Sequence, residues 1–179
     1  MTPSSPPLAD GDHLVLVGMM GSGKTTAGRL VAAALGRPLV DSDEQVETLT
    51  GRTVREIFES DGEAAYRVLE REALLAALDG AQPSVIAAAG GVVLDPVKRA
   101  ALKAAGTVVW LRAHPEVLAE RVNGGQDHRP LLADDPVGTL VRLDGERHHL
   151  YEEVAGHVVD IDELDPDEVA ARILELVRR

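Results

Sequence analysis

Short apolar runs alternate with longer amphipathic stretches along the whole chain. The apolar runs are rich in Val, Leu, Ile and Ala, which predicts buried strands at residues 13–17, 38–40, 84–88 and 107–111, with a weaker fifth at 157–160. Helical periodicity and capping residues predict helices between them, at residues 26–35, 53–58, 63–78, 96–105, 115–122, 136–153 and from 166 onward. This alternation is typical of a parallel sheet covered by helices.

A glycine-rich stretch lies between the first predicted strand and the first predicted helix. Residues 18–25 read GMMGSGKT and match the phosphate-binding pattern G-x-x-x-x-G-K-[ST], the P-loop. Its glycines allow backbone N–H groups to surround an anion, and the following helix adds its positive N-terminal end. Lys24 can reach the β- and γ-phosphates of a nucleotide, and the Thr25 hydroxyl can ligate Mg²⁺. A glycine-rich turn that holds nothing is the alternative, but the strand and helix on either side favour nucleotide binding.

Five strands in this setting imply a fold class: an α/β protein with a three-layer α/β/α sandwich and a five-stranded parallel sheet, of the P-loop NTPase type. The chain has 179 residues and only 2% aromatic residues, so we expect one domain with an aliphatic core. Residues 13–179 are predicted to form this single domain, and residues 1–12 a flexible N-terminal tail.

Composition narrows the class of protein further. The net charge of −12 argues against a nucleic-acid or anionic-membrane surface, because both need a basic footprint. No apolar run approaches the ~20 residues of a membrane span. The chain has no cysteine, which excludes a disulfide framework, a thiolate zinc site and a thiol nucleophile. We therefore expect a cytoplasmic protein that binds neither nucleic acid nor membrane, while an anionic small molecule stays possible. We expect a monomer, because the motifs described below all fit within one chain and no apolar surface stripe is evident.

Two aspartates follow the second predicted strand. Asp41 and Asp43 are two residues apart, so at the end of a strand both side chains would project to the same side. The carboxyl end of a strand in an open α/β sheet is where ligands bind. One carboxylate can hold Mg²⁺, directly or through water, and the other can accept a hydrogen bond from a substrate hydroxyl. An N-cap role for Ser42 or Asp43 explains one residue but not the pair of aspartates.

Three arginines accompany these motifs in an otherwise acidic chain. Arg67 belongs to the helix predicted at 63–78, with Glu70 three residues on to hold it in orientation. Arg129 lies in a long polar, glycine-bearing stretch, and Arg147 lies on the helix predicted at 136–153. Taken singly, each is most simply a solvated surface charge. An arginine can, however, grip a carboxylate with two hydrogen bonds or neutralise a transferring phosphoryl group.

Taken together, these motifs resemble those of the shikimate kinases over nearly the whole chain. The P-loop alone indicates only a nucleotide-binding protein, whereas the full set in this order and spacing is highly specific. The set consists of GMMGSGKT at 18–25, Asp41-Ser42-Asp43, Thr50-Gly51-Arg52, Ile57-Phe58, Asp61-Gly62-Glu63, Tyr66-Arg67, Leu69-Glu70, Gly90-Gly91, Arg129-Pro130-Leu131-Leu132, and Arg147 before Leu150-Tyr151.

The resemblance implies a nucleoside-monophosphate-kinase-like fold and transfer of the γ-phosphoryl group of ATP to the 3-hydroxyl of shikimate, with Mg²⁺. It also implies a substrate-binding region at residues 41–78 and a lid at residues 123–135. Arg67 and Arg147 would clamp the substrate carboxylate, and Arg121 would stack on adenine opposite Pro166. The implied catalytic residues are Lys24, Asp43 and Arg129. The residues implied to bind ATP are Gly21, Ser22, Gly23, Lys24, Thr25, Thr26, Arg121, Arg129 and Pro166, and those implied to bind Mg²⁺ are Thr25 and Asp41. The residues implied to bind shikimate are Asp43, Arg67, Gly90, Gly91 and Arg147.

One position departs from the family pattern. The family usually has three consecutive glycines where this chain has Ala89-Gly90-Gly91. If the first of these required a positive φ, Ala89 would be strained by about 1 kcal/mol or more. We expect instead that only the last two approach the ligand and that the first tolerates a methyl group.

Without the family resemblance, the residues themselves leave two other functions open. A kinase of another hydroxy acid, such as gluconate, would share the P-loop and an acidic D-x-D element, but would lack as a set the Gly-Gly turn and the Arg-Pro-Leu-Leu segment. A nucleotide-dependent switch module would need no substrate arginines, and Arg67 and Arg147 would then be surface charges.

Overall fold

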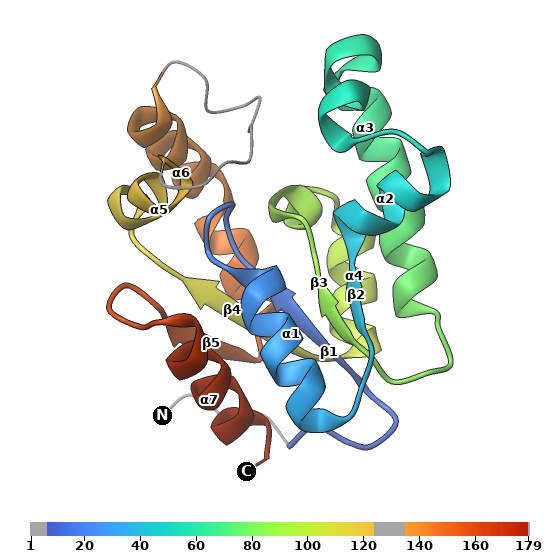
Figure 1. The fold of residues 1–179 in the computed structure, drawn as a ribbon, viewed down its shortest axis with the longest axis vertical. Coiled ribbons are helices and arrows are strands. Elements are labelled where there is room, and N and C mark those ends of the chain that lie inside the picture. The colour runs from blue at the N-terminus through green and yellow to red at the C-terminus, as the bar shows by residue number, and fades with distance from the viewer. Residues whose placement is uncertain (1–6, 124–134, 179) are drawn as a thin grey trace.

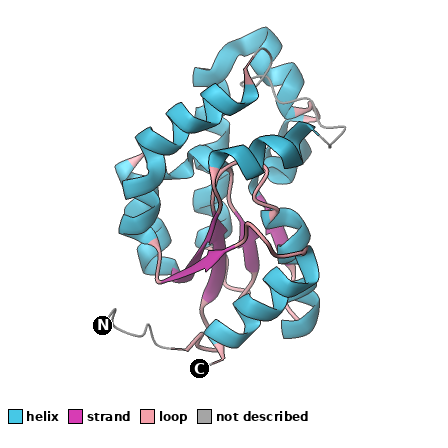
Figure 2. Ribbon diagram, turned by 90° about the vertical axis from the view of Figure 1, so that its left-hand side faces the viewer, coloured by secondary structure: helices cyan, strands magenta, loops and turns pink. Residues whose placement is uncertain are grey.

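The computed structural model describes residues 7–123 and 135–178. Within them, helices cover both faces of a five-stranded sheet (Figure 1), and the view at right angles shows the sheet between its helical layers (Figure 2). The predicted three-layer α/β/α architecture is confirmed. The elements in chain order are β1 (His13–Val17), α1 (Lys24–Leu35), β2 (Leu39–Asp41), α2 (Ser42–Thr50), α3 (Val54–Leu78), β3 (Val85–Ala87), the 3₁₀ helix η1 (Gly90–Leu94), α4 (Pro96–Ala105), β4 (Gly106–Arg112), α5 (Pro115–Asn123), α6 (Pro136–Val154), β5 (His157–Asp160) and α7 (Pro166–Val177).

The strand order places three sequence motifs at one edge of the sheet. The order is β2-β3-β1-β4-β5 and each pairing is parallel. β1 is central, with Val15 opposite Ile86 of β3 on one side and Val108 of β4 on the other. Because parallel strands end at the same edge, the segments that follow β1, β2 and β3 lie together there. These segments are the P-loop, the Asp41-Ser42-Asp43 stretch and the Gly90-Gly91 turn.

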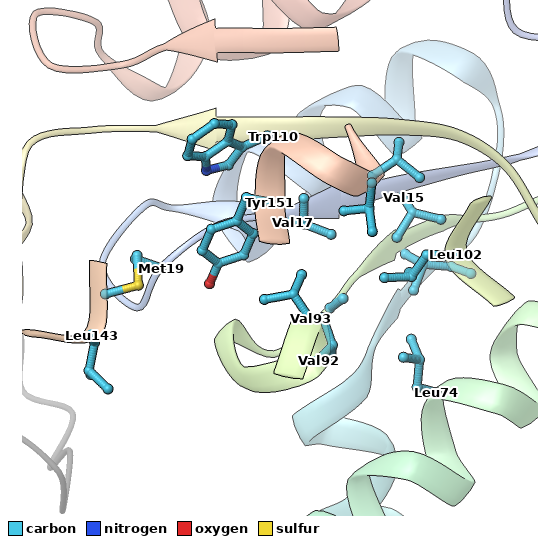
Figure 3. Packing of buried hydrophobic residues seen from close by; sticks show 14 of the residues in the cluster. Val15, Val17, Met19, Leu74, Val92, Val93, Leu102, Trp110, Leu143 and Tyr151 are labelled. Carbon is cyan, nitrogen blue, oxygen red and sulfur yellow. The ribbon is translucent and has the colours of Figure 1, made fainter. Parts of the chain in front are cut away.

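Alternate residues of β1 belong to two cores on opposite faces of the sheet. Val15 and Val17 pack in the core beneath α3, α4 and α6, part of which Figure 3 shows. Leu14 and Leu16 pack on the other face against α1 and α7. The aliphatic core expected from the composition is confirmed, and Trp110 is its largest buried side chain.

A third, smaller core lies between α2 and α3. It consists of Val46, Ile57, Tyr66 and Ala73, with Phe58 packed against it. This core gives the α2–α3 unit its own internal packing, so that residues 41–78 form a compact layer beside the carboxyl ends of β2 and β3 (Figure 1).

The predicted elements are observed with boundaries within one or two residues, apart from two differences. Helix α2 enters the predictions only as the alternative in which Ser42 or Asp43 caps a helix, and the short helix η1 is not among the predictions. The helix predicted to end at residue 58 continues to Asp61, and the break before the next helix lies at Gly62, where φ is 85° and ψ is 173°. This left-handed φ suits a glycine, so the predicted interruption is real although α3 is continuous as an element. The predicted strand at 38–40 lies at Leu39–Asp41.

Part of the predicted N-terminal tail contacts the domain. Leu8 N–H donates to the carbonyl of Val177, and Arg37 donates to the carbonyls of Ala9, Asp10 and Asp12. Residues 1–6 of that tail and residues 124–134 of the predicted lid lie outside the described residues. In the part of the chain that the structure describes, no helix has both the length and the apolar character needed to cross a membrane.

Candidate active site

The loop between β1 and α1 has the backbone geometry of an anion-binding turn. Gly21 and Gly23 have φ values of 82° and 78°, which residues other than glycine rarely adopt. A Cβ at Gly21 would also lie 2.8 Å from Val122. Helix α1 begins directly after Gly23, and no side chain of the described residues caps it. Its first N–H groups therefore point into the loop as donors for a phosphate.

Lys24 lies across this loop. Its Nζ donates to the carbonyls of Gly18 at 2.9 Å and Met19 at 3.0 Å, and lies 3.4 Å from Ser22 Oγ. These contacts hold the ammonium group over the turn rather than out in solvent. The predicted phosphate-binding lysine is thus placed where phosphate oxygens would meet it.

Thr25 and Asp41 bring a hydroxyl and a carboxylate together beside the P-loop. Thr25 Oγ1 donates to Asp41 Oδ2 at 2.5 Å. Asp41 Oδ1 accepts from the N–H groups of Asp43 at 2.9 Å and Glu44 at 3.2 Å, which makes Asp41 the N-cap of α2. The cap predicted as an alternative for Ser42 or Asp43 therefore belongs to Asp41. One residue thus fixes the start of α2 and faces the P-loop.

The donor set at Thr25 and Asp41 fits Mg²⁺. Hydroxyl and carboxylate oxygens are the ligands that Mg²⁺ prefers, and it usually binds one or two of them together with phosphate oxygens and water. Among residues 7–123 and 135–178, no group of three or more His, Cys, Asp or Glu side chains could hold a metal ion. A metal cage built from these side chains alone is therefore absent from the described residues.

Asp43 is held differently from the way the sequence pattern predicts. It lies in the first turn of α2, not on a strand, so the argument from strand alternation is wrong. Its Oδ1 accepts a hydrogen bond of 2.5 Å from the hydroxyl of Tyr66 on α3. Burial raises the pKa of the Asp43 carboxyl, the nearby Asp41 adds to this rise, and the hydrogen bond from Tyr66 and the charge of Lys24 oppose it. Asp43 is a partly desolvated carboxylate near the P-loop lysine.

Arg67 is fixed by two carboxylates and by the Gly91 backbone. Its Nη1 donates to Glu70 Oε1 and its Nη2 to Glu63 Oε1, both at 3.1 Å. The predicted pairing with Glu70 is confirmed. Burial opposes the charge on Arg67, but the carboxylates of Glu70 and Glu63 outweigh burial and raise its pKa. A Cβ at Gly91 would lie 2.2 Å from Arg67 Nη1, so the guanidinium occupies the space that a side chain there would need.

Arg147 approaches the same turn from α6. Its side chain is 3% exposed, and its Nε has no hydrogen-bond acceptor among the described residues. Its Nη1 lies 3.7 Å from the position of a Cβ on Gly90. Tyr151, one turn further along α6, donates its hydroxyl to the carbonyl of Gly90 at 2.6 Å. Arg67 and Arg147, distant in sequence, therefore converge on the Gly90-Gly91 turn, and neither is a solvated surface charge.

The position that departs from the family pattern carries no strain. Ala89 has φ −61° and ψ 150°, an extended conformation open to any residue. Its N–H donates to Ser42 Oγ at 2.9 Å, and Ser42 is 1% exposed. This hydrogen bond ties the start of α2 to the turn after β3, so the expectation that a methyl group is tolerated here is confirmed.

A pocket lies on the other side of the P-loop. Its volume is about 290 Å³ and it runs from the P-loop to α7, lined by Gly21, Ser22, Gly23, Thr26, Ala27, Arg121, Leu164, Pro166 and Val169. Arg121 Nη2 donates to the carbonyls of Ile161 at 2.6 Å and Leu164 at 3.3 Å. Arg121 and Pro166, predicted to enclose adenine, are thus both walls of one pocket that continues from the P-loop.

The structure brings together the predicted site residues in three groups: the P-loop with Asp41, the pocket with Arg121 and Pro166, and the Gly90-Gly91 turn with its arginines. Arg129 lies outside the described residues. The sequence assigns no role to three further residues that support the site: Tyr66, Tyr151 and Lys98. The two tyrosines belong to the family motifs Tyr66-Arg67 and Leu150-Tyr151, so their importance could have been predicted. Lys98 Nζ donates to Glu70 at 2.7 Å, but the sequence shows it only as one of the lysines of a predicted helix.

The chain is similar to proteins of one family. A family model described as shikimate kinase matches residues 20–178. A shikimate kinase of Symbiobacterium thermophilum is 45% identical over 165 residues, which cover 91% of this chain and 94% of that protein. A shikimate kinase of Paramagnetospirillum magneticum is 44% identical over 166 residues, covering 92% of this chain and 84% of that protein.

Solved structures give the same result. A shikimate kinase from Acinetobacter baumannii, solved in complex with shikimate, superposes with a TM-score of 0.87 at 33% identity, covering 97% of this chain and 94% of that one. A gluconokinase from Sinorhizobium meliloti superposes with a TM-score of 0.65 at 20% identity, covering 94% and 92% of the two chains. The second likeness concerns the fold alone.

Proposed function

The chain belongs to the shikimate kinase family, and from this premise we propose how its residues transfer the γ-phosphoryl group of ATP to the 3-hydroxyl of shikimate, giving shikimate 3-phosphate and ADP. The enzyme is an ATP-dependent phosphotransferase with an alcohol acceptor. The single observation that supports the acceptor is the convergence of Arg67 and Arg147 on the Gly90-Gly91 turn, on the same edge of the sheet as Asp43 and the P-loop. A carboxylate grip beside a hydroxyl acceptor suits a hydroxy acid.

The donor half of the site is the P-loop and the pocket beyond it. The N–H groups at the start of α1, together with Gly21, Ser22, Gly23 and Thr26, would bind the phosphates. Arg121 and Pro166 would enclose the adenine in the 290 Å³ pocket. Lys24 would neutralise the γ-phosphoryl group as charge develops on its oxygens. The nucleotide would therefore lie across the P-loop, with its γ-phosphate toward Asp43.

The acceptor half of the site would bind the hydroxyl and the carboxylate of shikimate at two separate places. Asp43 accepts a hydrogen bond from the 3-hydroxyl and orients its oxygen for attack on the γ-phosphorus. Burial raises the pKa of Asp43, which makes its carboxylate a better acceptor for the proton that the hydroxyl loses during transfer. Arg67 and Arg147 bind the substrate carboxylate, while Gly90 and Gly91 let the backbone approach the ring. This arrangement supplies positioning and charge neutralisation, the main needs of phosphoryl transfer.

Thr25 and Asp41 would hold Mg²⁺, Thr25 through its hydroxyl and Asp41 directly or through water. Bound there, Mg²⁺ would supply positive charge that offsets the negative charge of the phosphates. The hydroxyl and carboxylate already face one another at 2.5 Å, so the side chains need little rearrangement to share an ion.

Arg129 is proposed as the arginine that a lid at 123–135 brings to the transferring phosphoryl group, and exclusion of water by that lid would suppress hydrolysis of ATP. These residues lie outside the described part of the chain, apart from Asn123 and Asp135 at its ends. A cytoplasmic location, a monomeric state and a single domain from residue 13 onward also stay predictions.

A coupled assay with ATP, Mg²⁺ and a panel of acceptors tests the function. We expect ADP release with shikimate and none above background with gluconate, quinate or no acceptor. Turnover with gluconate in place of shikimate would make the chain a kinase of another hydroxy acid. Loss of ATP that is indifferent to every acceptor would indicate a nucleotide-dependent switch module.

A further inference from the structure

A buried lysine that is not among the proposed catalytic residues forms an ion pair with Glu70, which in turn pairs with Arg67 of the site. Lys98, on α4, is 3% exposed, and its Nζ donates to Glu70 Oε2 at 2.7 Å. Glu70, on α3, is fully buried. The other oxygen of the same carboxylate, Oε1, accepts from Arg67 Nη1 at 3.1 Å. Glu70 is therefore shared between one cation that faces the substrate and one that does not.

A lysine in this place needs an explanation beyond stability. Removing an ammonium group from water is costly, and a buried ion pair is often no more stabilising than apolar residues of similar size. Arg67 and Glu70 would already satisfy each other as a pair. Lys98 is the second cation on a carboxylate that needs only one.

The sharing changes how much positive charge Arg67 offers to a ligand. With Lys98 in place, half of the Glu70 carboxylate faces away from Arg67. The second carboxylate on Arg67, that of Glu63, is half exposed and so is screened by solvent. The group of Arg67, Lys98 and Glu70 thus has a net positive charge of one before Glu63 is counted. Without Lys98, the whole charge of Glu70 would compensate Arg67.

The sharing also fixes the geometry of Arg67. A carboxylate that is anchored at Oε2 presents Oε1 in one direction, and Arg67 Nη1 follows it to the Gly91 backbone, where a Cβ would lie 2.2 Å away. If Oε2 were free, the carboxylate could turn and accept from two N–H groups along one edge of the guanidinium in a bidentate pair. Arg67 would then be drawn toward α3 and away from the Gly90-Gly91 turn.

We propose that Lys98 is a positioning residue for the acceptor site: by holding one oxygen of Glu70, it orients Arg67 and keeps its charge available for the carboxylate of the substrate. This inference rests on the proposed function, since it concerns the affinity for shikimate. Lys98 itself does not touch the substrate, and a purely structural role in the packing of α3 on α4 is the competing explanation.

The test is Lys98→Met, which keeps the length of the side chain and removes its charge. We expect the KM for shikimate to rise about tenfold, with kcat and the KM for ATP changed less than about twofold. Lys103→Met is the matched control, because Lys103 lies on the same helix and its Nζ pairs with Glu153 Oε1 at 2.9 Å on the surface. That variant should match the wild type in all three constants. Lys98→Arg should restore most of the affinity.

Two further measurements separate positioning from packing. In an Arg67→Ala background, Lys98→Met should leave the KM for shikimate unchanged, because the residue through which it acts is gone. With the methyl ester of shikimate, which has no carboxylate charge, Lys98→Met should not change kcat/KM. A Lys98→Met effect that persists in either case would overturn the proposal and leave only the packing role.

The outcomes distinguish this inference from the function on which it rests. If the wild type does not phosphorylate shikimate, the proposed function fails. If the wild type is active and Lys98→Met has an unchanged KM for shikimate, the function stands and the role of Lys98 is wrong. Should Lys98→Met fail to fold, Lys98→Leu removes both the charge and the hydrogen bond to Glu70 with a different shape, and an unchanged KM for shikimate in that variant would overturn the proposal equally. Lys98→Gln, which keeps a hydrogen bond to Glu70 without the charge, then separates orientation of Arg67 from its charge: an unchanged KM in this variant would overturn the electrostatic part.

Discussion

Tyr66 donates a hydrogen bond of 2.5 Å to Asp43 Oδ1 and so joins the second part of α3 to the first turn of α2. The two residues are 23 positions apart in the sequence and belong to different motifs. The hydrogen bond favours the ionised form of a carboxylate whose pKa burial raises. If Asp43 accepts the proton of the substrate hydroxyl as proposed, Tyr66 extends to lower pH the range in which it can do so.

Tyr66→Phe should move the acidic limb of the pH profile to higher pH. Loss of the hydrogen bond removes an influence that lowers the pKa of Asp43, so the carboxylate is protonated at a higher pH than in the wild type. At mildly acidic pH we expect a several-fold loss of kcat/KM, which recovers toward the wild-type value as pH rises. Measurement of kcat/KM for shikimate against pH checks this. Phe58→Leu, which alters the ring packed at 4.7 Å from Tyr66, is the control that should keep the wild-type limb.

Asp43→Asn should stabilise the fold while it abolishes activity. The pKa of Asp43 is raised in the folded protein from its ordinary value of 3.8, so its ionisation costs the folded state free energy. That cost is absent below pH 3.8 and complete above the raised pKa. Asparagine still accepts from Tyr66 but carries no charge. At pH 8 we expect a higher Tm than that of the wild type, together with a loss of kcat of about 10²- to 10⁴-fold.

The pH dependence of melting supplies the control for Asp43→Asn. The gain in Tm over the wild type should shrink as the pH falls through the raised pKa, because the wild-type carboxyl then becomes neutral as well. A Tm difference that is constant from pH 8 to pH 4 would contradict this origin of the effect.

Gly91→Ala and Gly90→Ala should differ in their effect on shikimate affinity. A Cβ at Gly91 would lie 2.2 Å from Arg67 Nη1, whereas a Cβ at Gly90 meets its nearest neighbour, the carbonyl oxygen of Gly18, at 3.4 Å. Neither glycine has a positive φ, so the backbone accepts alanine at both. Gly91→Ala should displace the guanidinium and raise the KM for shikimate by about tenfold or more, against less than about threefold for Gly90→Ala. Equal effects in steady-state assays would show that Arg67 does not depend on this space.

Thr25→Val should weaken the use of Mg²⁺ without disturbing the fold. Valine has the shape of threonine but no hydroxyl, and Asp41 keeps its N-cap hydrogen bonds to the start of α2. We expect the concentration of Mg²⁺ for half-maximal activity to rise by about tenfold or more. Thr25→Ser, which keeps the hydroxyl, should stay near the wild type. Titration of activity with Mg²⁺ at saturating shikimate checks this, and identical Mg²⁺ curves for the valine and serine variants would exclude Thr25 as a ligand.

The sequence predicts the sheet well because its strands are short apolar runs between clear turn and cap signals. Helix α2 is predicted only as an alternative because its buried positions are only Ser42 and Val46, which give no apolar periodicity. This lack of apolar periodicity in α2 also explains why the geometry inferred for Asp43 is wrong. Both aspartates do lie at the site, but a helix start, not strand alternation, places the second one there.

Long-range packing limits what the pattern alone can predict about the site. Arg67 and Arg147 can be suspected from their motifs, yet their meeting at the Gly90-Gly91 turn depends on how α3 and α6 pack. Lys98 gives no signal at all, since a lysine near the start of a helix is ordinarily exposed. Only the contact between α3 and α4 buries it against Glu70.

The placement of the chain's single tryptophan has an optical consequence. Trp110 stacks on Tyr151, with ring centroids 5.5 Å apart (Figure 3). Tyr151 donates its hydroxyl to the carbonyl of Gly90. A movement of that turn on shikimate binding would reach the only tryptophan through this single hydrogen bond and the stacked ring. If the turn binds shikimate as proposed, we expect a shikimate titration to change the emission of Trp110, so that binding can be followed without a label.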